Sequence, residues 1–257
     1  MESVTNEQIE SVATMLKAIL FTDNEQRKVQ EAELIKLRTE HPTIIVSCLL
    51  SIMTLSPEAP TRALAAVLMR QTVSMFDRSS INAWSLMTPE AKAAFKVALL
   101  EVATKETEKG VRLRIADALG EIGATILKSN EDWTELMTYL FKSAITDDVV
   151  VVANSLKIFN SLFTYCFDNM VGFTNELYSI FSKTLNTDNL EVKVNTIEAM
   201  CSLLSIVETE HCMKFTALLP QMLQTLVAII QLSEYDAKES MENIIALAES
   251  EYKFFKK

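Results

Sequence analysis

Side chains able to do catalytic or metal chemistry are few in this chain. Its two histidines, His41 and His211, are far apart, and its four cysteines lie in apolar stretches: Cys48, Cys166, Cys201 and Cys212. A zinc site uses two closely spaced pairs of ligands, a spacing that His211-Cys212 and Cys201 lack. The sequence also lacks phosphate-binding glycine loops and the G-x-S-x-G turn of serine hydrolases. We therefore predict no enzyme, no metal site and no cofactor, and we expect reduced, buried thiols of a cytosolic or nuclear protein.

Charged residues form a more informative pattern in the segment that follows Val111. Apolar residues recur there with the period of a helix, while Arg114, Asp117 and Glu121 fall at i, i+3 and i+7 on another face. Two glycines lie in the same helix, although each costs about 1 kcal/mol relative to alanine, which indicates a closely packed neighbouring helix. The charged face suits binding better than catalysis. A solvated face with intrahelical ion pairs is the alternative explanation.

The composition predicts an all-helical protein. Four glycines and five prolines in 257 residues are too few for a fold with many tight turns, and 49% of the residues are hydrophobic. No apolar run reaches the length of about 18 residues that crosses a membrane, and the acidic start of the chain is unlike a signal peptide. The formal net charge of −10 argues against nucleic acid and anionic membranes as partners. It fits a basic partner, or simply a soluble helical surface.

A repeat of about 40 residues organises the whole sequence. Each repeat is predicted to be a pair of helices, and we expect one continuous solenoid over residues 1–257 with no linker. Inside three pairs the turn reads Thr-Asp-Asn or Thr-Asp-Asp, beginning at Thr22, Thr146 and Thr187, so that side-chain oxygens can cap the next helix. Thr88 followed by Pro89 is a similar helix start. The six predicted pairs comprise residues 5–40, 42–76, 88–129, 133–168, 171–208 and 211–256.

Two segments complicate this helical interpretation. Val149–Val152 is a run of β-branched residues that locally favours a strand, but the preceding turn and the helical spacing of later apolar residues favour a helix. In the last pair we predict a first helix from His211 to Leu232, kinked at Pro220, and a second helix from Glu234 to Lys256. A polar insert, Asp77–Thr88, precedes the third pair.

Several motifs together resemble the start of the importin-β (karyopherin-β) family, nearest the importin five (karyopherin β3) branch. The pattern R-K-x-x-E-x-x-L-x-x-L at Arg27–Leu37 resembles the first repeat of that family, although Gln30 stands where alanine is usual. T-R-A-L-A-A-V-L-M-R-Q at Thr61–Gln71 is similar to the second repeat. The segment Leu86–Leu100 and the long helix after it resemble the third. The resemblance covers essentially the whole chain in register.

This resemblance implies a fold and a set of partners. The fold is all-α, a right-handed α-solenoid (superhelix) of about six HEAT repeats, and the chain resembles the N-terminal fragment of a longer protein. The implied function is nucleocytoplasmic protein import by a monomer that shuttles between cytoplasm and nucleus. The implied partners are the GTPase Ran in its GTP form, bound on the concave face of the second helices, cargo proteins of basic character and Phe-Gly nucleoporins. Neither nucleic acid nor membrane insertion is expected.

Site residues follow from the resemblance and from the helical pattern together. By position, Arg70 and Gln71 belong to Met69-Arg70-Gln71, which corresponds to the three family residues that are expected to contact Ran. The helical pattern adds Arg114, Asp117 and Glu121 from the third pair, and the corresponding residues of the fourth pair are Asn154 and Lys157. The alternative from a different class is a structural HEAT scaffold, such as a phosphatase regulatory subunit or an assembly factor, which would have this fold without a GTPase partner.

Overall fold

The computed structural model describes residues 4–74, 82–231 and 238–256, without the side chains of residues 164, 166–171 and 239. Contacts between Cα atoms divide the chain into two compact units, Met1–Leu136 and Met137–Lys257. Each unit is described by itself. The predicted single solenoid over residues 1–257 therefore stays a prediction.

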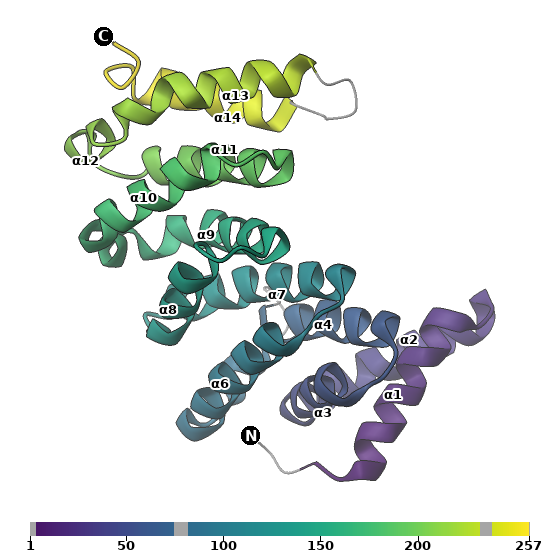
Figure 1. Cartoon of the computed structure of the whole chain (residues 1–257). Coiled ribbons are helices and arrows are strands. Elements are labelled where there is room, and N and C mark those ends of the chain that lie inside the picture. Colours follow the sequence, from purple (N-terminus) through teal and green to yellow (C-terminus); the bar gives the residue numbers. More distant parts are fainter. Residues whose placement is uncertain (1–3, 75–81, 232–237, 257) are drawn as a thin grey trace. The chain divides into compact units, whose positions relative to one another are not determined.

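The first unit consists of helices that pack within a pair and against the next pair along the chain (Figure 1). Helix α1 packs on α2 and also contacts α3 and α4, while α4 packs along α7. The short helix α5 lies within the predicted polar insert, of which residues 77–81 are outside the described part. The helices of this unit are α1 (Asn6–Phe21), α2 (Asn24–Glu40), α3 (Pro42–Leu55), α4 (Ala59–Ser74), α5 (Ala83–Leu86), α6 (Pro89–Lys105) and α7 (Lys109–Lys128).

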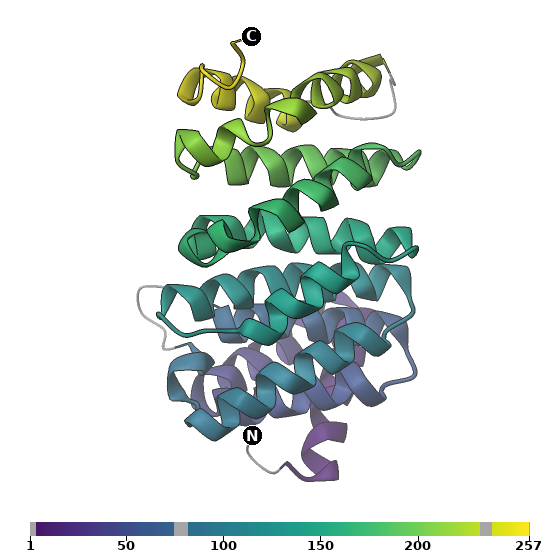
Figure 2. The same cartoon turned by 60° about the vertical axis from the view of Figure 1, so that its left-hand side comes forward.

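The second unit repeats the same arrangement of layered helix pairs (Figure 2). Helix α11 packs against α9 on one side and α14 on the other, and α10 contacts α13. Helix α8 (Thr134–Ser143) runs across the boundary between the units. The other elements are α9 (Val149–Met170), the 3₁₀ turn η1 (Val171–Phe173), α10 (Thr174–Leu185), α11 (Leu190–Leu204), α12 (Thr209–Met213), the 3₁₀ turn η2 (Thr216–Leu218), α13 (Leu219–Gln231) and α14 (Lys238–Ser250).

The predicted helix starts are confirmed by their capping hydrogen bonds. The Asp23 carboxylate accepts from the backbone N–H groups of Glu25 and Gln26 at 3.0 Å, and Thr88 Oγ1 accepts from Ala91 N at 3.3 Å. Asp148 and Asn189 cap α9 and α11 in the same way. Because the first N–H groups of a helix have no partner within it, these short polar side chains fix where each helix begins.

The valine run Val149–Val152 is the first turn of α9, which confirms the predicted helix. The predicted helix from His211 to Leu232 is wrong. The chain there forms α12, η2 and α13 in succession, and Leu232 lies outside the described residues, as does Glu234 of the next predicted helix. Pro220 is the second residue of α13, where a proline has no N–H bond to lose, so it lies at a helix start and causes no kink.

Helices α4 and α7, which pack on each other, both bury small residues. Ala65 and Ala66 of α4 have no exposed surface, and Gly120 and Gly123 of α7 are buried. Larger apolar side chains of both helices, such as Met69 and Leu119, are buried as well, and α4 and α7 pack extensively on each other. This contact fixes how side chains of α4 and α7 meet at the surface.

Larger side chains fill the space between successive pairs. Trp84 and Phe95 lie in the first unit, and Phe159, Phe163 and Phe181 lie in the second, all of them almost completely buried. The rings of Phe159 and Phe163 stack with centroids 5.5 Å apart. These aromatic residues are core, and burying them supplies much of the favourable free energy of folding. Within the described ranges, no helix is long and apolar enough to cross a membrane.

Candidate protein-binding surface

Polar side chains from α2, α4 and α7 meet in the first unit. We call this set the polar row, and it includes five of the predicted site residues together with one that the sequence did not indicate: Arg38, Arg70, Gln71, Arg114, Asp117 and Glu121. Its members come from α2, α4 and α7, which are the second helices of the first three pairs, so each successive pair contributes side chains to it.

An ion pair between two helices lies at the centre of the polar row. Nε of Arg70 on α4 lies 3.3 Å from Oε2 of Glu121 on α7, and the two side chains are 34% and 50% exposed. The close packing of α4 and α7 brings the two residues together although they are 51 positions apart in the sequence. Their exposure leaves both charges within reach of a partner protein.

Arg114 and Asp117 form a second, weaker contact within α7. Nη1 of Arg114 lies 3.5 Å from Oδ2 of Asp117, at the i, i+3 spacing that the sequence predicts. The predicted charged strip on α7 is therefore divided, since Arg114 and Asp117 contact each other whereas Glu121 contacts the neighbouring helix. That the strip faces a concave groove stays a prediction.

Arg38 at the end of α2 extends the polar row to a third helix. Its Nη1 donates to Oε1 of Gln71 at 3.3 Å. Burial lowers the pKa of the Arg38 guanidinium from its usual value. The sequence motif at Arg27–Leu37 did not indicate Arg38, because it ends one position before that residue. A usable signal was present, since Arg38 follows the buried Leu34 by four residues and so lies on the packed side of α2.

The remaining predicted site residues, Asn154 and Lys157, lie nearly one turn apart on α9 in the second unit, and both are partly buried. The polar row belongs to the first unit. Next to them, Nδ2 of the buried Asn195 on α11 donates to the carbonyl oxygen of Ala153 at 3.1 Å, and Ser202 of α11 donates to Asn160 of α9. Polar contacts thus link successive second helices in this unit as well.

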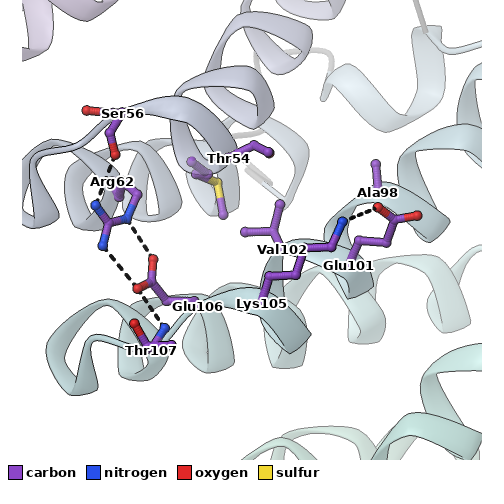
Figure 3. A pocket seen from close by; sticks show the side chains of 10 residues that line it. Thr54, Ser56, Arg62, Ala98, Glu101, Val102, Lys105, Glu106 and Thr107 are labelled. Atoms are coloured by element: carbon purple, nitrogen blue, oxygen red, sulfur yellow. Dashed lines mark hydrogen bonds and ion pairs between the residues drawn. The ribbon is translucent and has the colours of Figure 1, made fainter.

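A buried ion pair supports α4 and α7 away from the polar row (Figure 3). Nε and Nη2 of Arg62 donate to the Glu106 carboxylate at 2.7 and 3.0 Å, and Nη1 donates to the carbonyl oxygens of Ser56 and Pro57. Arg62 thereby joins the turn between α3 and α4 to the turn between α6 and α7. Hydrogen bonds from Arg62 hold the pKa of Glu106 below its usual value, and the same bonds raise the pKa of Arg62.

A cavity of about 300 Å³ opens beside this ion pair, lined by Met53, Val102 and Lys105 among others. Figure 3 shows Lys105 turned toward Glu101, its ion-pair partner at 3.0 Å, rather than toward Arg62. Because the donors of Arg62 are engaged with Glu106 and with the carbonyl oxygens of the turn, the role of this ion pair is structural.

The described cysteines are buried and free of disulfides. Burial raises the pKa of Cys201 to about 12 and that of Cys212 to about 11. A thiol with such a pKa is protonated at neutral pH and is a poor nucleophile and metal ligand. Cys166 lies outside the described side chains. Across the described part of the chain, no three histidine, cysteine, aspartate or glutamate side chains are grouped as a metal site.

Comparison with known proteins relates this arrangement to one family of repeat proteins. A family model described as IPO5-like, TPR repeats, matches residues 107–257. Both TPR and HEAT repeats are helix pairs, with periods of about 34 and 40–47 residues respectively. Here α9 begins at Val149 and α11 at Leu190, a spacing of 41 residues that fits the HEAT type. No curated protein matches the chain.

Solved structures of the karyopherin Kap121p have the same fold. Kap121p bound to the SUMO protease Ulp1p matches 98% of this chain with a TM-score of 0.79 and 21% identity. The complexes of Kap121p with Nup53p and with RanGTP match with TM-scores of 0.77 and 0.75, at 20% and 21% identity, again over 98% of this chain. The chain spans about a quarter of the length of these proteins, 24%, 24% and 23% respectively.

The likeness to Kap121p confirms the predicted fold class, an all-α solenoid type built from HEAT repeats. The family match covers more than half of the sequence and confirms the predicted IPO5-like family, in a region that begins after the motifs at residues 27–100. The chain belongs to the family described as IPO5-like.

Proposed function

We propose that this chain is the Ran-binding region of a nuclear transport receptor, and that it binds Ran in its GTP form through the polar row. Membership of the IPO5-like family supports this proposal, and so does the likeness to Kap121p, which has been solved bound to RanGTP. The observation that carries the proposal is the contact between Arg70 and Glu121, because it brings exposed charges from two successive second helices to one surface.

Binding without chemistry is the mechanism of this function. In a repeat protein each helix pair contacts only its neighbours, so the chain can change curvature at low cost. A ligand that prefers one curvature shifts the chain toward it, and a second ligand is then affected reciprocally. Ran and cargo would be coupled in this way through shape. We include Asn154 and Lys157 of α9 as further Ran contacts in the second unit.

Cargo and nucleoporins complete the proposed set of partners. Kap121p has been solved bound to Ulp1p and to Nup53p, which supports cargo and nucleoporin binding by this chain. Its net charge of −10 suits cargo of basic character. The proposed receptor is a monomer that moves between cytoplasm and nucleus.

The decisive experiment compares two nucleotide states of Ran. The 257-residue chain is titrated with Ran loaded with a non-hydrolysable GTP analogue and with Ran loaded with GDP, by isothermal titration calorimetry. The proposal requires clearly tighter binding to the GTP form. Equal affinity for both forms, or no binding to either, rejects it and favours a structural HEAT scaffold without a GTPase partner.

A further inference from the structure

Arg70 is only partly used by its ion pair with Glu121. A guanidinium carries five N–H donors in a planar fork that binds a carboxylate through two parallel hydrogen bonds. Here a single nitrogen, Nε, contacts a single oxygen of Glu121, at 3.3 Å. Within the described ranges neither terminal nitrogen of Arg70 makes a hydrogen bond. The fork of Arg70 is therefore held in place while most of its donors stay open to a second carboxylate.

We propose that Glu121 is a built-in competitor for Arg70: its carboxylate offsets the charge of the guanidinium at Nε until a carboxylate of the partner protein takes its place. This inference rests on the proposed function, which makes the polar row the contact surface. It adds the chemistry of the contact, namely an acidic side chain of Ran at Arg70, and a residue of this chain that opposes binding.

The strength of the contact suits such an exchange. Both side chains are exposed, at 34% and 50%, and exposed ion pairs with one contact contribute little to stability. Glu121 can therefore turn into solvent without disturbing the packing of α4 on α7 (Figure 1), since the residues buried on the two helices, such as Met69 and Leu119, are apolar. By contrast, the buried pair of Arg62 and Glu106 in the same two repeats uses two nitrogens and two oxygens and is closed to a partner.

The local charge also favours an acidic partner group. The polar row contains three arginines, Arg38, Arg70 and Arg114, against two carboxylates, so it is net positive within a chain whose net charge is −10. A basic partner group at Glu121 is the opposite arrangement. The two arrangements predict opposite changes in affinity when the charge of Glu121 is removed. If an acidic partner group binds Arg70, affinity rises because a competitor is lost. If a basic partner group binds Glu121, affinity falls because its binding group is lost.

The test is the affinity of Glu121→Gln for Ran loaded with the non-hydrolysable GTP analogue. We expect binding about two- to five-fold tighter than that of the wild type, because the competing charge is gone. The control is Glu101→Gln on α6, which removes the same charge from another exposed ion pair, with Lys105 at 3.0 Å, and should leave the affinity unchanged. If Glu121 acts through Arg70, the substitution Glu121→Gln should give no gain in affinity in a chain that already carries Arg70→Gln. The double variant Arg70→Gln/Glu121→Gln must therefore bind with the same affinity as Arg70→Gln alone.

The outcomes separate this inference from the proposed function. Wild-type binding with an unchanged or weaker affinity of Glu121→Gln overturns the competitor role and leaves the Ran-binding function standing. A gain that survives without Arg70 also overturns it, since general electrostatics would then explain the effect. Failure of the wild type to bind the GTP form rejects both.

Discussion

The carboxylate of Glu106 accepts two hydrogen bonds from Arg62 and two more from the backbone N–H groups of Thr107 and Glu108. Its side chain is 5% exposed and that of Arg62 is 15% exposed. One buried carboxylate thus binds the turn that leads into α7 and, through Arg62, the turn before α4. This contact joins the second and third helix pairs.

Removal of that carboxylate should destabilise the first unit strongly. We expect Glu106→Ala to lower the free energy of unfolding by about 3–5 kcal/mol, because it leaves a buried guanidinium without its counter-charge. Urea unfolding followed by circular dichroism measures the change. Glu101→Ala, at an exposed pair on α6, is the matched control and should cost less than about 1 kcal/mol. Equal effects of the two substitutions would show that the buried pair has no special role.

The same pair should make stability depend on acid pH. The pKa of Glu106 in the folded chain lies below its unfolded value, which is about 4.3 for a glutamate. The Glu106 carboxylate therefore contributes fully to the free energy of unfolding at pH values above the unfolded-state pKa. That contribution is lost as the pH falls through the pKa of the folded state. The stability difference between wild type and Glu106→Gln should be constant from pH 7 to 6 and smaller at pH 3. A difference that grows on acidification would contradict the assignment.

Charge reversal at Arg70 should weaken Ran binding. Arg70→Glu removes the guanidinium and places a like charge beside Glu121, so we expect a loss of about tenfold or more in affinity for the GTP form. Helical circular dichroism should not change, since Arg70 is on the surface. Arg27→Glu on α2 is the matched control, because Arg27 is also exposed and paired with a glutamate, Glu31, yet lies outside the polar row. Equal losses in the two variants would point to net charge alone.

The hydrogen bond between α11 and α9 should stabilise the second unit. Asn195 is 8% exposed and donates to the carbonyl oxygen of Ala153. We expect Asn195→Ala to cost about 1–2 kcal/mol, from the lost bond and the space that it leaves. The exposed Asn186 on the same unit provides the comparison, and its replacement by alanine should cost clearly less. Thermal unfolding of both variants checks the difference.

The buried thiols should not react in the folded chain. Burial places the pKa of Cys201 near 12 and that of Cys212 near 11, and Cys48 is buried as well, its pKa also raised by burial. In a Cys166→Ser variant we expect almost no labelling by iodoacetamide at pH 8, and three labelled thiols in denaturant, counted by mass spectrometry. Rapid labelling of any of the three under native conditions would show that its helix opens readily.

The sequence predicted local features of the fold well and relationships between distant helices poorly. Helix starts at Asp23, Thr88 and Asn189 depend on side chains within three residues, so the turn motifs were enough to locate them. In the sixth pair, the sequence predicted one long first helix where the structure has α12, η2 and α13. Pro220 did not distinguish the two, because a proline is compatible with either a kink or a helix start.

The candidate site shows the same limit. Helical spacing alone groups Arg114, Asp117 and Glu121, and the pair of Arg114 with Asp117 follows directly. The partner of Glu121 does not follow, because it depends on how α7 packs against α4, and that packing joins residues about fifty positions apart in the sequence. Arg62 and Glu106, 44 positions apart, could not be paired from the sequence for the same reason.

The neighbour-to-neighbour packing of the helices has a consequence for how the chain assembles. Within each unit the helices contact elements that lie close to them in the sequence, such as α3 with α4 and α9 with α11. Little loop entropy must be lost before such contacts form, so each unit has a low contact order and should reach its native state quickly. Under a pulling force, a chain of this kind gives way pair by pair at low tension, and it can re-form from whichever pair remains.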